Sequence, residues 1–186
     1  MSLVRTPVHV ALLFTAATML GATPLWAQRT APSEEYRLKA AFVYRFPQFV
    51  EWPAPSLDGH ESITICILRP NPFGAVLREL IAGETLNGRP LAVREIDRPS
   101  ALTGCHVVFV PGANNPAAKA VVAAVGAHPV LTVGESSQFL DEGGVISLQV
   151  VDRLVRFEVN ATAAERLGLR LSSQFLRLAV RVKGAS

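Results

Sequence analysis

Cysteine is scarce in this sequence, and its charges are too evenly balanced and too scattered to form a nucleic-acid-binding surface. The only cysteines are Cys66 and Cys105, and no histidine stands at metal-ligand spacing from either, which argues against a zinc site. Setting aside Arg5, which falls in the leader discussed below, leaves 17 basic residues (18 less 1) against 15 acidic ones. The sequence therefore predicts neither metal binding nor nucleic-acid binding.

The motifs of catalysis are missing as well. There is no G-x-S-x-G nucleophile elbow, no H-E-x-x-H metal motif and no phosphate loop with its lysine. The serine pair Ser172-Ser173 stands where a helix is expected to begin, so capping explains it. His60, His106 and His128 occur singly, and a lone histidine beside a strand is usually structural. We therefore expect no enzymatic activity and no cofactor.

Long apolar runs are limited to the start of the chain. A positive residue, an apolar stretch over residues 8–20 and a small residue at Ala27 follow the order of a secretory signal. The stretch is short for a membrane span, and no later segment could cross a bilayer. We interpret residues 1–27 as a signal peptide cleaved near Ala27, and residues 28–186 as one periplasmic domain without direct membrane insertion.

What the sequence does contain is an alternation of buried strands and helices. The run Ile63–Leu68 is apolar on both parities, which suits a central strand of a parallel sheet. Further strands are expected at Leu91–Ile96, Cys105–Val110 and Val130–Val133, and helices after Asn71-Pro72, after Asn115-Pro116 and at Ser136–Leu140. This order predicts the α/β class: a layered α/β/α domain with a largely parallel central sheet.

The opening segment reads as an amphipathic helix from Glu34. Phe42, Phe46 and Phe49 recur at i, i+4 and i+7 and mark one apolar face. Pro47 removes a backbone donor and clashes with the preceding turn. The helix should therefore kink or end near Phe46.

The last quarter adds a β-hairpin and helices. Residues 145–151 and 154–159 flank Asp152-Arg153, which is typical of a hairpin with a tight turn. Thr162 to Glu165 matches a capping box and predicts a short helix that starts at Thr162. A final helix is expected after Ser172 or Ser173, with an apolar stripe of Phe175, Leu176, Ala179 and Val180.

Polar residues in this otherwise apolar region are the candidates for recognition. Arg156, Glu158 and Asn160 share one parity and should project from one face of their strand. Together with Arg170 and Gln174 they form either a recognition surface for a protein or small ligand, or simply a solvated face. Both interpretations fit the sequence.

The two cysteines lie in a chain that is expected to be exported. An even pair in an oxidising compartment favours a disulfide, and two buried free thiols are the alternative. Closing a loop of this size would stabilise the fold by about 3–4 kcal/mol in the chain-entropy model.

Segments along most of the chain resemble the YfiR family of periplasmic regulators. The resemblance rests on Lys39–Tyr44 with Phe49–Pro53, Asn71–Gly74, Leu86–Pro90, Gly104–Phe109, Pro129–Glu135, Gly143–Ile146, Val155–Asn160 and Gly168–Gln174. Each segment alone is weakly specific, whereas the ordered set is specific. Pro47 departs from the family, whose helix usually continues there.

The resemblance implies a function as well as a fold. It implies a homodimer that binds the periplasmic sensing domain of an inner-membrane diguanylate cyclase and holds the enzyme inactive, which lowers cyclic di-GMP and biofilm formation. Cys66 and Cys105 match a family disulfide pair, whereas a second pair that some members carry near Gly143-Gly144 is missing here. The candidates for contact with the partner or a ligand are Ile146, Arg156, Glu158, Arg170 and Gln174.

Two functional hypotheses remain open from the sequence. The first is the protein-binding repressor, with apolar residues of the hairpin or opening helix in contact and Arg156 and Glu158 as rim charges. The second is a periplasmic small-ligand-binding protein with a different signalling output. Its site would lie in the loops after Leu68, Val110 and Val133, at the carboxyl ends of the strands, with Arg170 meeting an acidic ligand.

Overall fold

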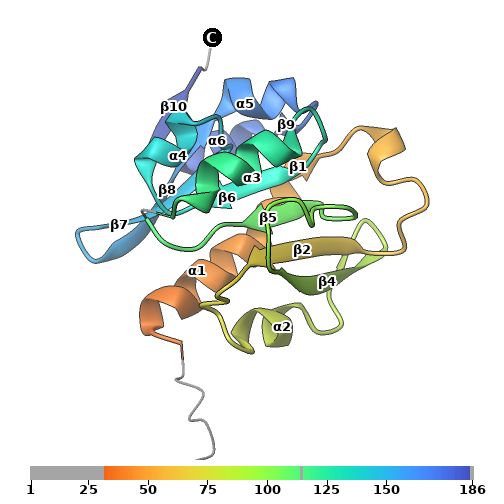
Figure 1. Cartoon of the computed structure of the whole chain (residues 1–186), viewed down its shortest axis with the longest axis horizontal. Helices are drawn as coiled ribbons and strands as arrows, with labels where there is room; N and C mark the ends of the chain where they lie inside the picture. Colours follow the sequence, from red (N-terminus) through yellow and green to blue (C-terminus); the bar gives the residue numbers. More distant parts are fainter. Residues whose placement is uncertain (1–31, 114, 185–186) are drawn as a thin grey trace, which may run out of the picture.

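A computed structural model describes residues 32–113 and 115–184, so the predicted signal peptide lies outside the described residues. Eight strands form one sheet in the order β10-β8-β7-β6-β5-β2-β4-β3 (Figure 1). Their bounds are β2 (Ile63–Leu68), β3 (Thr85–Leu86), β4 (Arg89–Ile96), β5 (Val107–Phe109), β6 (Leu131–Gly134), β7 (Ile146–Val151), β8 (Leu154–Asn160) and β10 (Arg181–Lys183). A separate pair, β1 (Val50–Glu51) and β9 (Arg170–Leu171), is antiparallel.

Helices cover both faces of the sheet. The helices are α1 (Glu34–Arg45), α2 (Val76–Ile81), α3 (Ala117–Val125), α4 (Ser137–Asp141), α5 (Ala161–Arg166) and α6 (Ser173–Leu178), with 3-10 turns η1 (Phe46–Phe49) and η2 (Ala54–Ser56). Figure 1 shows α1 and α2 on one side of the sheet and α3 and α4 on the other. The predicted α/β class and its three-layer arrangement are confirmed.

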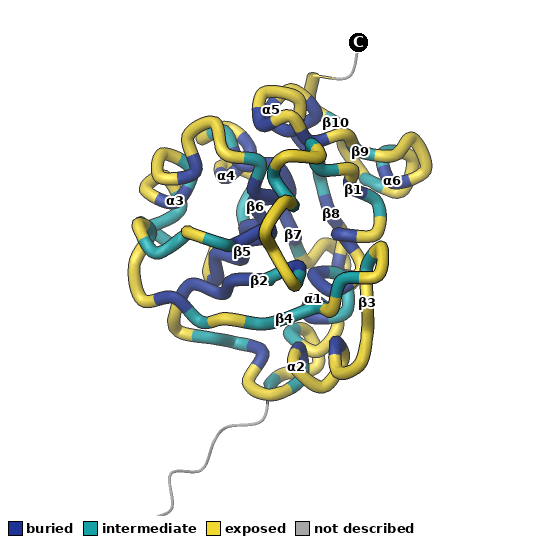
Figure 2. The backbone as a smooth tube through the Cα atoms, turned by 90° about the vertical axis from the view of Figure 1, so that its right-hand side faces the viewer, coloured by how far each residue is buried: buried dark blue, intermediate teal, exposed yellow. Residues whose placement is uncertain are grey.

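The centre of the sheet is parallel and fully enclosed. Strands β4, β2, β5, β6 and β7 run parallel to one another, and antiparallel pairing occurs only at β7 with β8 and β4 with β3 among the described strands of this sheet. The apolar run of β2 is buried on both faces, as its sequence predicts (Figure 2). Because its neighbour β5, and β6 on the far side of β5, are also buried, the core sits around these three strands.

The local signals at the hairpin and the opening helix are confirmed. Asp152 and Arg153 have φ of 50° and 65°, so both residues of the two-residue turn are left-handed, as a type I′ hairpin requires. Helix α1 ends at Arg45, and Pro47 stands in the first turn of η1, where its missing N–H costs nothing. Ser172 caps α6 by accepting a hydrogen bond from the Phe175 amide.

Two predicted helix starts are wrong. Helix α2 begins at Val76 rather than after Asn71-Pro72, because the Asn71 side chain accepts a hydrogen bond from the Phe73 amide (2.9 Å) and closes a local turn first. Helix α5 begins at Ala161 rather than at Thr162, because Asn160 caps it through the Ala163 amide (2.9 Å).

The expected apolar stripe of the last helix is too long. Helix α6 ends at Leu178, and Val180 is 55% exposed beyond it. The chain then pairs Arg181–Lys183 in parallel with β8. A three-residue strand offers too short a pattern for the sequence to reveal it.

The predicted disulfide is confirmed. Cys66 on β2 and Cys105 just before β5 are bonded, with Cα atoms 5.7 Å apart. The Arg94 guanidinium lies over the bond, with Nη2 3.0 Å from Cys105 Sγ. The bridge thus ties the middle of β2 to the chain just before the neighbouring strand β5.

Candidate functional site

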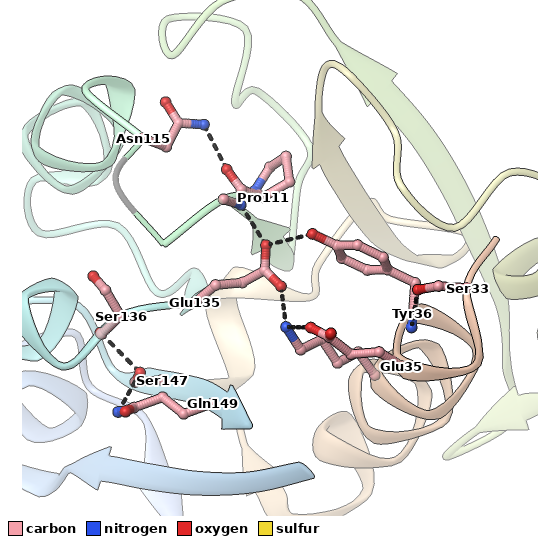
Figure 3. Close-up of polar contacts among 11 residues, drawn as sticks. Ser33, Glu35, Tyr36, Pro111, Asn115, Glu135, Ser136, Ser147 and Gln149 are labelled. Atoms are coloured by element: carbon pink, nitrogen blue, oxygen red, sulfur yellow. Dashed lines mark hydrogen bonds and ion pairs between the residues drawn. The ribbon is translucent and has the colours of Figure 1, made fainter. Parts of the chain in front are cut away.

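The carboxyl ends of the parallel strands meet at one edge of the sheet, between β2 and β5. From β2 the chain crosses to β4 on one side, whereas from β5 it continues to β6 and β7 on the other. Open α/β sheets commonly bind ligands in the crevice that such a reversal creates. In this protein the N-terminal half of α1 projects side chains into that place (Figure 3).

Glu135, the residue after β6, is the centre of a buried polar cluster there. Lys39 Nζ from α1 pairs with Glu135 and also with Glu35 Oε1 at 2.5 Å. The Tyr36 hydroxyl donates to Glu135 Oε2 at 3.3 Å, and the backbone amide of Gly112, after β5, donates to the same oxygen. The side chains of Lys39 and Glu135 are only 5% and 3% exposed. One carboxylate therefore joins α1 to the loops after β5 and β6.

The pKa values in this cluster follow from burial and pairing. Burial and the charge of Glu135 raise the pKa of the Tyr36 phenol. Burial lowers the pKa of Lys39, but hydrogen bonds to Glu135 and Glu35 outweigh it, and the net pKa lies above the ordinary lysine value. Tyr36 and Lys39 therefore keep their protons at neutral pH, and Lys39 remains a cation that pairs with both Glu35 and Glu135.

The cluster occupies the position that the sequence assigned to a small ligand. The loops after Val110 and Val133 do meet there, through Gly112 and Glu135, but the chain's own lysine already pairs with the carboxylate. A cavity of about 330 Å³ remains beside the pair, lined partly by Glu35 and Gln149. Arg170 lies on β9, outside the eight-stranded sheet.

The opposite side of α1 faces an apolar groove. Its volume is about 280 Å³, and its walls come from α1, η1, β8 and α6. Leu38 (46% exposed) and Leu178 (59% exposed) stand at its rim, and Arg45 is its one charged lining residue among the described part of the chain. The lining residues, hereafter the α1–α6 groove, are Leu38, Ala41, Phe42, Arg45, Phe46, Phe49, Phe157, Phe175 and Leu178.

Stacked phenylalanines form the floor of the α1–α6 groove. Phe175 stacks on Phe157, with ring centroids 4.8 Å apart, and on Phe49 at 5.5 Å. Phe46 contacts both Phe157 and Phe175 edgewise or tilted at 5.4 Å. The sequence revealed each aromatic on its own element, whereas their convergence depends on the end of α1 at Pro47 and on the β8 register, which only the fold shows.

Residues 36–180 match the family model described as YfiR/HmsC-like (DUF4154). The chain belongs to the YfiR/HmsC-like family. The resemblance found in the sequence is thus confirmed over most of its length. Membership of this YfiR/HmsC-like family suggests a periplasmic regulator of diguanylate cyclase signalling, and a regulatory rather than a catalytic domain.

Two solved structures resemble this YfiR/HmsC-like chain in fold. One is a conserved domain protein from Vibrio cholerae O1 biovar El Tor strain N16961, with a TM-score of 0.52 and 15% identity. The other is the ABC domain from Streptococcus pneumonia in complex with L-Trp, with a TM-score of 0.51 and 12% identity. Each alignment covers 80% of this chain but 60% of the other, and at these identities the likeness shows the fold alone.

The predicted recognition residues of the hairpin lie on one face of β8. Arg156 is exposed opposite Gln149, and Glu158 lies opposite Ser147 and accepts a hydrogen bond from Arg181 at 2.5 Å. Both point away from the face that carries Phe157, so they do not line the α1–α6 groove. Asn160, on the same parity, is buried and serves as the cap of α5.

The remaining predicted residues of this YfiR/HmsC-like domain are dispersed. Ile146 is completely buried on β7, so its side chain is not available to a partner in this conformation. Arg170 is exposed opposite Glu51, and Gln174 is exposed on α6. The sequence analysis did not identify Lys39 or Glu135 as site residues. One signal for Lys39 was present: it stands four residues before Val43, which places its charge on the buried face of α1.

Two further expectations concern ions and membranes. Within residues 32–113 and 115–184, no group of three His, Cys, Asp or Glu residues could hold a metal ion. No helix in that same part of the chain is long and apolar enough to cross a bilayer.

Proposed function

We propose that this protein is an exported periplasmic repressor that binds the sensing domain of an inner-membrane diguanylate cyclase and holds the enzyme inactive. The cell would then keep cyclic di-GMP low and form less biofilm. Family membership supports the signalling context. The observation that carries the repressor role is the open α1–α6 groove, because a folded domain rarely leaves an apolar depression with partly exposed phenylalanines and exposed leucines at its rim without a partner.

The chemistry of the groove fits a protein partner. Protein interfaces concentrate their binding energy in aromatic anchors that lie in apolar depressions, with a few charges at the rim. Here Phe42 and Phe49 are partly exposed on a floor of buried Phe157 and Phe175, and Arg45 stands at the edge. We infer that the groove receives apolar side chains of the cyclase sensing domain, with an acidic group of the partner near Arg45.

Mass action explains how binding could inhibit. A sensing domain with two conformations shifts toward the one that the repressor binds better, by no more than the difference in binding free energy. In this proposal the groove fits the inactive conformation. Loss of the repressor, or a change that reshapes the groove, returns the cyclase to its active population.

A homodimer is part of the same proposal, on the strength of the family resemblance. Light scattering of the purified mature protein would give its mass directly. A mass of two chains at micromolar concentration supports the dimer, and a single-chain mass over the same range removes it from the proposal.

The small-ligand hypothesis at the carboxyl edge has less support. Lys39 and Glu135 neutralise each other there, and α1 covers the crevice. A ligand in the cavity beside the pair would meet a Glu135 carboxylate whose oxygens are already used by Lys39, Tyr36 and the Gly112 amide.

The experiment that tests the proposed function is deletion of the gene followed by measurement of cellular cyclic di-GMP. We expect the level to rise on deletion and to fall again when the gene is restored on a plasmid. An unchanged level after deletion, in a strain whose parent is shown by immunoblot to export the protein, would reject repression of a cyclase.

A further inference from the structure

The disulfide bond lies against the positive charge of Arg94. Arg94 on β4 stands in register with Cys66 on the neighbouring strand β2, so the two side chains leave the sheet on the same face. The Arg94 Nη2 atom is 3.0 Å from Cys105 Sγ and 3.5 Å from Cys66 Sγ. One guanidinium group therefore contacts both sulfur atoms, and the sulfur of Cys105 is the nearer.

The charge of Arg94 is not neutralised by a carboxylate. Arg94 takes part in none of the ion pairs in the described part of the chain. The acidic residues next to it in sequence, Glu95 and Asp97, pair with other arginines. Nη2 also donates to the Ala101 and Thr103 carbonyls at 3.4 and 2.5 Å, and these acceptors are uncharged. The cation is thus held in place beside the two sulfurs.

The two cysteines differ in how they can be reached. Cys66 lies within β2 and is completely buried, so its exposure requires a central strand to open. Cys105 stands at the amino edge of the sheet, where the parallel strands begin, and it is 6% exposed. It follows residues 97–104, a segment of turns and bends in which every residue is exposed or half-buried. A small displacement of this segment would uncover Cys105 first.

A cavity of about 380 Å³ adjoins Cys105 at this edge. Its walls also include His60, His106 and His128, which are far apart in the sequence. None of the residues that line it is an aspartate or a glutamate, so no carboxylate there opposes the charge of Arg94. The chain has no cysteine besides the bonded pair, and any thiol that attacks the bond must therefore come from another molecule.

We propose that Cys105 is a site of thiol exchange, at which a small thiol forms a mixed disulfide with the help of Arg94. The incoming thiolate bonds to Sγ of Cys105 while the bond to Cys66 breaks. Cys66 leaves as a thiolate and takes up a proton from water. The incoming sulfur is oxidised and the Cys66 sulfur is reduced, so the step needs no further oxidant. Arg94 stabilises the negative charge as it passes between the sulfurs.

Bridge formation uses the same groups in reverse. In the reduced protein Arg94 favours the thiolate at Cys105, the nearer sulfur. That thiolate attacks a small disulfide, releases one of its two sulfurs as a thiolate and keeps the other in a mixed disulfide. Cys66 then attacks Sγ of Cys105 as a thiolate and displaces the second sulfur. Neither direction depends on the proposed repressor function.

The first test compares the rates at which charged dithiols open the bridge in the purified, oxidised mature protein at pH 7 and low ionic strength. Dihydrolipoate is an anion, and dithiobutylamine is a cation. Acid quenching, maleimide labelling of the freed thiols and mass spectrometry give each rate. Taking the ratio of the two rates cancels any change in how often residues 97–104 open. We expect the dihydrolipoate to dithiobutylamine ratio to fall by about 3–10-fold in Arg94→Gln.

Two further variants separate the charge of Arg94 from other effects. Arg94→Lys keeps the charge and should retain most of the wild-type ratio. Arg98→Gln removes an exposed arginine of the same 97–104 segment and should stay within about twofold of the wild type. Equal ratios in the wild type and in Arg94→Gln would overturn the proposal.

A second experiment identifies the reactive sulfur. The reduced protein, freed of reductant without air, is treated with limiting iodoacetamide at pH 7, and peptide mass spectrometry measures the label on each cysteine. We expect Cys105 to take at least about threefold more label than Cys66, and the excess to shrink in Arg94→Gln and in concentrated urea. Preferential labelling of Cys66 in the folded protein contradicts the assignment. If circular dichroism shows that the reduced chain is unfolded, the dithiol rates decide, because they start from the oxidised protein.

Discussion

The two edges of the parallel sheet handle charge in opposite ways. At the carboxyl edge, Lys39 from α1 pairs with Glu135, and the pair is almost completely buried. At the amino edge, His106 and Arg89 each keep a buried donor without a partner in the described structure. The first edge pairs its buried charges with one another, whereas the second leaves two buried N–H donors without an acceptor among the described residues.

Helix α1 contributes residues both to the buried pair and to the α1–α6 groove. Tyr36 and Lys39 fix the helix to the carboxyl edge, while Leu38 and Phe42 line the α1–α6 groove. Because one helix carries both sets, the buried pair positions the surface on which the proposed function rests. Polar groups in a crevice therefore need not mark a ligand site, since here they hold α1, and with it the α1–α6 groove, in place.

Breaking the Lys39–Glu135 pair at the carboxyl edge should have the largest effect on stability. Lys39→Met leaves the Glu135 carboxylate buried without its cation, and we expect a loss of about 3–5 kcal/mol in unfolding free energy. Urea titration measures this, with Arg37→Met on the exposed side of α1 as the control. The double variant Lys39→Met/Glu135→Leu should recover most of the loss, and equal stability of Lys39→Met and Arg37→Met would contradict the role assigned to the pair.

The pH dependence of the Lys39–Glu135 pair follows from the direction in which the pKa of Lys39 is shifted. The pKa of Lys39 is raised in the folded protein, so its stabilisation is complete below the ordinary lysine pKa of about 10.4. It should be lost only as the pH rises through the folded-state pKa, above that value. A loss that begins near neutral pH would not come from this lysine.

Removing the disulfide should have the second largest effect on stability. In the chain-entropy model, Cys66→Ala/Cys105→Ala lowers the unfolding free energy by about 3–4 kcal/mol. Urea midpoints with and without dithiothreitol measure the effect, and the reduced wild type should approach the double variant, which itself should not respond to reductant. A wild-type midpoint that ignores full reduction would show that the bond stabilises nothing.

Acid should weaken the amino edge by a smaller amount through His106. Between pH 6.5 and 4 the unfolded chain binds a proton at this residue and the folded chain does not, so stability falls as the pH falls. We expect His106 to contribute about 1–3 kcal/mol of this loss. His106→Gln should lack that part of the acid response in urea titrations, whereas His128→Gln, at an exposed position, should retain it.

Local patterns predicted the elements well and their interactions poorly. The buried run of β2, the hairpin turn at Asp152 and the cap at Ser172 depend on neighbours in sequence, and each was correct. The helix starts expected at Asn71 and Thr162 were wrong for two different reasons. The Asn71 side chain closes a local turn, and Asn160 caps the other helix two residues before Thr162. In such cases two local options differ by only about 1 kcal/mol, and the tertiary structure decides between them.

Sites made of distant residues were not accessible from one sequence. Lys39 and Glu135 are 96 residues apart, and His60, His106 and His128 come together only because β5 lies between β2 and β6. Once the strand order is known, a histidine before each of these strands becomes a clear signal. The family resemblance supplied the signalling context that neither pattern nor motif could give.

The proposed function requires that the protein acts through the α1–α6 groove. The most direct test is cyclic di-GMP in the deletion strain carrying Leu178→Glu, which places a charge on the groove rim, or Leu80→Glu, which places one on exposed α2 away from it. With both variants exported at equal levels, we predict that Leu80→Glu restores the low cyclic di-GMP level and Leu178→Glu leaves it at the deletion level. Full restoration by Leu178→Glu would contradict the account.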